Sequence, residues 1–109
     1  MLYFIAGPPN ISNSHETNVR KRSVTLICDI FLYENSPPML EVVWTKNNDV
    51  LDISGSGGKL GGGSIANPSL VINKINEFDA GSYQCKAFNA AGSTLGNVIV
   101  LGKSCIYVK

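Results

Sequence analysis

The most constraining feature of this chain is the spacing of its cysteines, its one tryptophan and one tyrosine. Trp44 follows Cys28 by 16 residues, Cys85 follows Trp44 by 41, and Tyr83 stands two residues before Cys85. Two cysteines on facing β-sheets can close a disulfide across a core, and a large indole can pack against the sulfurs. A tyrosine near a corner of such a core can return its hydroxyl to the backbone. The spacing therefore suits a two-sheet protein, provided that the surrounding segments are strands.

The segments around these residues have the pattern of short strands separated by turns. Alternation is clearest from Ser23 to Ile30, where Val24, Leu26 and Cys28 fall on one face. No long stretch shows a 3.6-residue apolar period. Residues 7–10 contain two prolines and suit an edge strand. We expect further strands over residues 40–45, 69–75, 82–88 and 95–101, which together predict an all-β sandwich or barrel.

Composition and charge exclude several classes of protein. The 109 residues make one domain, and nine basic against eight acidic residues give a net charge of 9 − 8 = +1. This balance argues against nucleic-acid binding, which needs a concentrated basic surface. An apolar content of 44% is too high for a disordered chain. No apolar run approaches the ~20 residues of a membrane span, so we expect none in this chain.

Four stretches resemble one known family over nearly the whole chain. VTLIC (24–28) resembles strand B, VVWTKN (42–47) strand C and LVINKI (70–75) strand E of an immunoglobulin-superfamily domain. DAGSYQCKAFNAAG (79–92) resembles strand F and the F–G turn of the intermediate set (I-set) within that superfamily. The resemblance implies a two-sheet antiparallel Greek-key sandwich over residues 7–103, with an N-terminal extension (1–6) and a C-terminal tail (104–109).

The resemblance also implies roles for particular residues. It implies a disulfide between Cys28 and Cys85, which would stabilise the fold by ~4 kcal/mol in the chain-entropy model. The interval from Cys28 to Trp44 is longer than is usual for the family, so the B–C loop (31–39) carries extra residues. The third cysteine, Cys105, has no standard place and is a candidate for an intermolecular disulfide. The resemblance further implies a core containing Trp44, Tyr83 and Leu70, and an ion pair between Lys59 and Asp79.

No catalytic or cofactor motif is found in the sequence. The glycine-rich stretch 54–64 is not a phosphate-binding loop, because Ile53 occupies the first glycine position and Leu60 stands where Ser or Thr is required. It predicts a flexible connection in which strand D is short or missing. The one histidine, His15, has no evident second base. We therefore expect no enzyme activity, no cofactor and no metal site.

Two surfaces are candidates for binding a protein partner. Strand alternation turns Val43 and Phe88 outward, and in one register of the last strand Ile99 and Leu101 join them, with Val98 and Val100 facing in. A slip of one residue reverses this register. An exposed apolar patch of this kind indicates an interaction site. The second surface is the tip formed by the B–C loop and the F–G turn, with candidate contacts Tyr33, Glu34 and Asn89.

The predicted function is protein recognition without catalysis, in an extracellular or cell-surface protein of cell-adhesion or immune-recognition type. The expected partner is a second copy or another surface protein. Asn10-Ile11-Ser12 is a glycosylation motif and agrees with this setting. One alternative is a spacer I-set domain of an intracellular, muscle-type filament protein, in which the cysteines stay reduced. Another is a binder of carbohydrate or of microbial surfaces.

Overall fold

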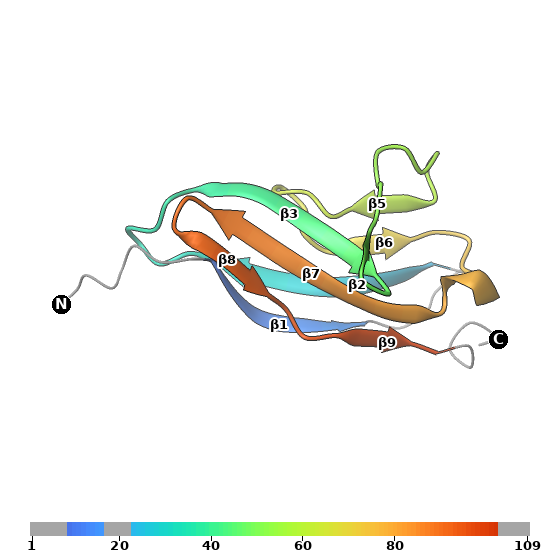
Figure 1. The fold of residues 1–109 in the computed structure, drawn as a ribbon. Coiled ribbons are helices and arrows are strands. Elements are labelled where there is room, and N and C mark those ends of the chain that lie inside the picture. Colours follow the sequence, from blue (N-terminus) through green and yellow to red (C-terminus); the bar gives the residue numbers. More distant parts are fainter. Residues whose placement is uncertain (1–8, 17–22, 103–109) are drawn as a thin grey trace.

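Two antiparallel sheets pack face to face in the computed structural model, which describes residues 9–16 and 23–102 (Figure 1). The first sheet has the strand order β1-β2-β6-β5. In the second, β4 pairs with β3, β3 with β7, and β7 with both β8 and β9. The predicted all-β immunoglobulin-like sandwich is thus confirmed. Cys105 and the expected extension and tail lie outside the described residues.

The strands are short and differ in length. The first sheet contains β1 (Asn10–Glu16), β2 (Val24–Phe31), β6 (Leu70–Ile72) and β5 (Leu60–Gly62). The second contains β4 (Asp49–Val50), β3 (Met39–Lys46), β7 (Gly81–Asn89), β8 (Gly92–Leu95) and β9 (Ile99–Leu101). A 3-10 turn, η2 (Glu77–Asp79), precedes β7.

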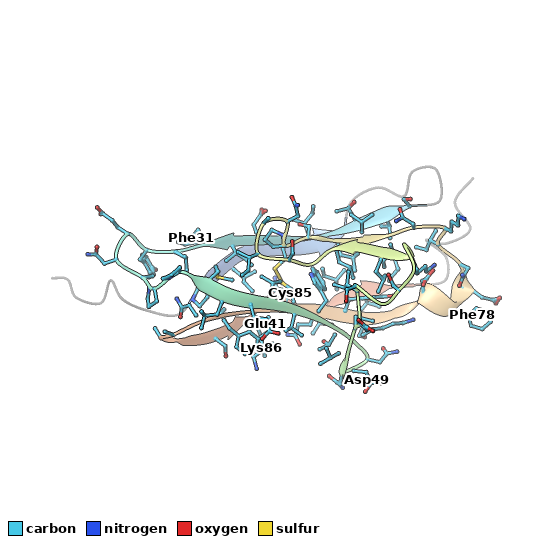
Figure 2. The ribbon with its side chains drawn as sticks, turned by 90° about the horizontal axis from the view of Figure 1, so that it is seen from above. Phe31, Glu41, Asp49, Phe78, Cys85 and Lys86 are labelled. Carbon is cyan, nitrogen blue, oxygen red and sulfur yellow. A yellow bond between two sulfur atoms is a disulfide. The ribbon has the colours of Figure 1, made fainter. Side chains whose placement is uncertain are left out.

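The core lies between the sheets and follows from strand alternation. On β7, Tyr83, Cys85 and Ala87 point inward and are buried, whereas the residues between them are half-buried. Removing each large apolar side chain from water contributes about 1.5–3 kcal/mol. The labelled Cys85 lies midway along the sandwich in Figure 2, with Phe31 toward one end and Phe78 at the other. The buried side chains with the largest volumes are Trp44, Tyr83, Leu26, Leu70, Ile72 and Leu101.

The last strand differs from the sequence prediction in two ways. The expected single strand 95–101 is divided into β8 and β9, because residues 96–98 leave the ladder. The predicted register was also wrong, since Ile99 and Leu101 are 5% and 1% exposed, whereas Val98 and Val100 are 56% and 66% exposed. The physical reason is that Ile99 pairs with Tyr83, which faces the core, so both side chains point to the same side of the sheet.

The connection between β3 and β6 contains the glycine-rich stretch and one short strand. Leu60–Gly62 forms β5, which pairs with β6 and agrees with the expectation of a short strand D. The strand predicted over 69–75 is reduced to β6, because the chain turns at Lys74, which has a positive φ of 49°.

Candidate functional site

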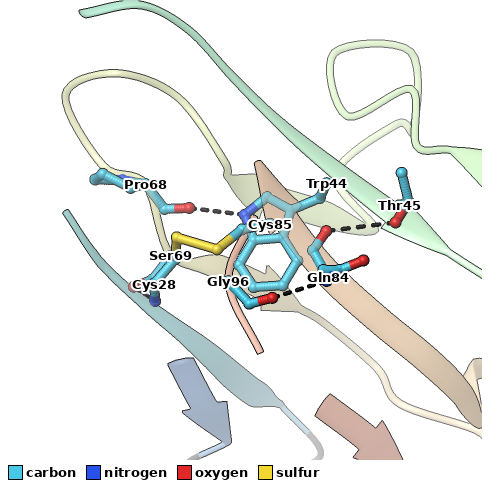
Figure 3. Close-up of a disulfide and its surroundings, with 8 residues drawn as sticks. All are labelled: Cys28, Trp44, Thr45, Pro68, Ser69, Gln84, Cys85 and Gly96. Atoms are coloured by element: carbon cyan, nitrogen blue, oxygen red, sulfur yellow. Dashed lines mark hydrogen bonds between the residues drawn. A yellow bond between two sulfur atoms is a disulfide. The ribbon is translucent and has the colours of Figure 1, made fainter. Parts of the chain in front are cut away.

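A disulfide and a buried tryptophan join the two sheets in the core. Cys28 of β2 and Cys85 of β7 are bonded with their Cα atoms 6.5 Å apart. The Trp44 indole is fully buried, and its Nε1 donates to the Pro68 carbonyl oxygen at 2.7 Å (Figure 3). The Cys28 N–H donates to the Ser69 hydroxyl at 3.0 Å. The disulfide and the indole hydrogen bond attach β7 and β3 to the first sheet, whereas the Ser69 bond lies within the first sheet.

A hydrogen-bonded corner holds the start of β7. The Tyr83 hydroxyl donates to the carbonyl oxygen of Asp79. The Asp79 carboxylate accepts from Lys59 Nζ at 2.6 Å and from the Asn76 N–H at 2.8 Å. Burial first, and then the nearby Asp79 charge, raise the pKa of Tyr83 well above its ordinary value, so the phenol stays neutral. Lys59 and Asp79 therefore form an ion pair that braces this corner.

The outer face of the second sheet is hollowed. A depression of about 450 Å³ lies across β4, β3, β7 and β8. We call this depression the hollow. Its apolar lining comes from Val43, Val50, Phe88 and Leu95, and its polar lining from Glu41, Thr45, Asn48, Gln84 and Lys86. Strand alternation explains the set, because Glu41, Val43 and Thr45 on β3, and Gln84, Lys86 and Phe88 on β7, project from the same side.

Charge and aromatic surface lie together in the hollow. Lys86 Nζ is 5.0 Å from the centre of the Phe88 ring, a distance at which the cation is attracted to the ring face. Glu41 and Lys86 lie near each other in Figure 2 and both line the hollow. The hollow thus presents apolar side chains together with one acidic and one basic group.

The structure brings together part of the apolar patch predicted from the sequence. Val43 and Phe88 line the hollow, but Ile99 and Leu101 are buried in the core and cannot contact a partner. Leu95 takes part instead. Sequence reasoning did not name it, although an unbroken strand with Ile99 and Leu101 outward would also have turned Leu95 outward. The last strand is interrupted after Leu95 at Gly96, whose N–H donates to the Cys85 carbonyl oxygen and whose carbonyl accepts from Gln84 Nε2 at 2.7 Å.

The tip formed by the β2–β3 loop and the β7–β8 turn contains the other predicted contacts. Tyr33 is 49% exposed, and its ring lies 5.8 Å from that of Phe31 in an edge-on arrangement. Glu34 is exposed as well. Asn89, however, is 6% exposed and is not a surface contact. Its Nδ2 donates to the Pro37 carbonyl and its Oδ1 accepts from the Ala91 N–H, so it links the loop to the turn.

Residues 9–16 and 23–102 contain no group of three or more His, Cys, Asp or Glu side chains placed to hold a metal ion. Over the same residues, no helix combines the length and apolar character needed to cross a bilayer.

Two known proteins are similar to this chain in sequence. Neogenin from Rattus norvegicus is 34% identical over 102 residues, which cover 76% of this chain and 7% of neogenin. Fibroblast growth factor receptor-like 1 from Gallus gallus is 32% identical over 98 residues, covering 87% of this chain and 18% of that protein. The chain therefore spans less than a fifth of the length of either relative.

Solved structures show the same fold. The I67–I69 fragment from the titin I-band has a TM-score of 0.68 at 25% identity, covering 88% of this chain and 32% of that one. The Ig1-2 module of the Drosophila receptor protein tyrosine phosphatase DLAR has a TM-score of 0.68 at 23% identity, covering 89% of this chain and 46% of that one. The family model of the immunoglobulin domain matches residues 8–89, so this chain belongs to the immunoglobulin domain family.

Proposed function

We propose that this chain is an extracellular, non-catalytic recognition domain that binds a protein partner through the outer face of its second sheet. The observation that carries the proposal is the hollow, where Val43, Phe88 and Leu95 are joined by the charged Glu41 and Lys86. Protein interfaces characteristically combine a buried apolar or aromatic centre with a polar rim. The similarity to fibroblast growth factor receptor-like 1 supports a place in a surface protein.

The rigidity of the face supports the same proposal. Val43 and Phe88 belong to β3 and β7, which pair over most of their length and are tied to the first sheet through the disulfide of Cys85. A partner that docks on fixed strands pays little for ordering the surface, so more of the contact energy appears as affinity. Phe88 is the aromatic anchor of this face.

A second copy of the chain is the partner that the charges of the hollow favour. Glu41 and Lys86 lie on the same face, at diagonal positions of paired strands. When two such faces meet about a two-fold axis, Glu41 of each copy can face Lys86 of the other. The opposite charges then fix the register of the contact more than they add affinity.

The test compares Phe88→Asp with Ile65→Asp, a matched control in the loop before β6 that is 50% exposed and lies outside the hollow. Sedimentation over a range of concentrations detects self-association, and a fluorescent multimer of the domain detects partners on cells. We expect Phe88→Asp to abolish whichever binding the native domain shows, and Ile65→Asp to leave it unchanged. Native protein that binds in neither assay, or binding that survives Phe88→Asp, refutes the proposal.

The extracellular setting rests on the Cys28–Cys85 disulfide and on the Asn10 glycosylation motif. Secreted protein, unfolded under non-reducing conditions, should then show one free thiol or a Cys105-linked dimer, and should lose mass on treatment with an N-glycosidase. The likeness to the titin fragment favours a second candidate, a spacer domain of an intracellular filament protein. Three free thiols in protein isolated from its native source would establish that alternative.

A further inference from the structure

Strand β3 has an edge that its neighbour covers only in part. β4 pairs with Thr45 and Lys46, and the Leu51 N–H then donates to the Trp44 carbonyl oxygen at 2.9 Å. Among the described residues, no strand pairs with β3 on this side before Trp44, although β3 begins at Met39. Figure 1 shows the same arrangement, since the half of β3 nearer the tip has no strand alongside it opposite β7.

The register shows which main-chain groups lie at this edge. The Trp44 carbonyl points away from β7, and successive residues of an antiparallel strand turn their N–H and C=O groups to alternate sides. The N–H and C=O of Val42 therefore also point to the edge, while its side chain packs in the core. Leu40 has no register partner in β7, because the β3–β7 pairing shifts between Met39 and Glu41. Its side chain is 64% exposed.

We infer that this edge accepts an extended segment of another protein, which adds to the sheet as a strand and places a Lys or Arg opposite Glu41. Val42 supplies a main-chain donor and acceptor at this edge, and Glu41 lies next to it. In an added antiparallel strand the side chain opposite Glu41 lies about 4.5–5.5 Å away, where opposite charges are favourable and like charges are not. The Glu41 carboxylate therefore selects a basic partner.

The same carboxylate disfavours a second copy at this edge. If two β3 strands pair about a two-fold axis so that Leu40 of each copy meets Val42 of the other, Glu41 faces Glu41 at the centre. Two carboxylates in that position repel. Charged side chains on an edge strand are a common protection against self-pairing. Sliding the register by two residues brings Leu40 against Trp44, whose carbonyl is already bonded to Leu51.

This inference goes beyond recognition at the hollow, because it concerns main-chain groups at the edge of the sheet. The probe is the capped heptapeptide Thr-Val-Thr-Lys-Thr-Val-Thr, compared with the same peptide carrying Glu at its centre. Binding is followed through the amide resonances of the isotopically labelled domain. We expect the Lys peptide to shift the amides of residues 40–43 and to bind about fivefold more tightly than the Glu peptide. Glu41→Lys should reverse this order.

Two further variants separate the edge from the hollow. Phe88→Ser, which removes the aromatic ring from the hollow without adding a charge opposite Glu41, should leave the preference for the Lys peptide intact, so the two proposals can fail independently. Glu41→Thr in the Phe88→Ser background should self-associate, because the repelling charge is gone. Equal binding of both peptides, shifts confined to the hollow, no shift at millimolar Lys peptide, or a monomeric Glu41→Thr variant would overturn the inference.

Discussion

The ion pair between Lys59 and Asp79 gives a quantitative test of how the corner before β7 is held. The Asp79 side chain is 11% exposed and that of Lys59 31%, with Nζ and Oδ2 2.6 Å apart. Asp79→Asn keeps an oxygen that can accept from the Asn76 N–H but removes the charge. Hydrogen bonds to charged groups contribute about 1.5–3 kcal/mol, so we expect a loss of about 2 kcal/mol in the free energy of unfolding.

A double-mutant cycle isolates the pair itself. Lys59→Met keeps most of the aliphatic stem and removes the ammonium group, which leaves the Asp79 carboxylate without its cation. Because Asp79 is largely buried, we expect a coupling energy of about 1–2 kcal/mol, above the 0.2–1 kcal/mol typical of exposed pairs. This range of coupling energies already allows for the weakening of the pair by solvent around the partly exposed Lys59.

Urea unfolding of the four proteins measures these values, provided that they share one m-value. The single variants should melt roughly 8–16 °C below the native domain. Added salt should weaken the coupling only slightly, because a partly buried pair is poorly screened. A coupling energy below about 0.3 kcal/mol would show that the contact is an ordinary surface pair and that the corner is held by its neutral hydrogen bonds alone.

Three further predictions concern the core. Tyr83→Phe should lower the free energy of unfolding by about 1–2 kcal/mol near neutral pH. Because the pKa of Tyr83 is raised in the folded state, the native domain should also lose stability as the pH rises above about 10, where the tyrosine of the unfolded chain ionises first. Urea titrations at several pH values should show less of this loss in the variant. Replacing Cys28 and Cys85 together by Ala should lower the free energy of unfolding by about 4 kcal/mol, measured in urea, because the disulfide closes a loop of 57 residues. Gly63→Ala should lower the melting temperature by roughly 8 °C or more in calorimetry, since φ is +64° and the new Cβ would lie 2.3 Å from Ile53 Cδ1 and 3.1 Å from Trp44 Cδ1.

The fold could be predicted from the sequence because its signals are local and agree with each other. Alternation around Cys28 and Cys85 gives the two central strands, and Trp44 lies on the strand that pairs with the second of them. The outward positions of Val43 and Phe88 follow from the same alternation. These predictions needed only the period of a strand, which does not depend on its neighbours.

The last strand could not be predicted in this way, because residues 95–101 are apolar on both faces and alternation alone does not set the register. The register is set by pairing, since Ile99 lies opposite Tyr83 and Leu101 opposite Gly81. Asn89 was misjudged for a related reason. Its predicted place in the F–G turn suggested exposure, but its side-chain amide donates to the carbonyl of Pro37, which is 52 residues away in the sequence.

The division of the last strand has a consequence for recognition. Leu95 lies opposite Lys86 in β8, and Val100 lies opposite Ser82 in β9, so both side chains project from the outer face although Val100 follows Leu95 by five positions, an odd number. An unbroken strand would place them on opposite faces, because side chains alternate with a period of two. The irregular residues 96–98 reset the alternation. They keep Ile99 and Leu101 in the core and still leave Leu95 to line the hollow, so the same irregularity serves both packing and the proposed binding face.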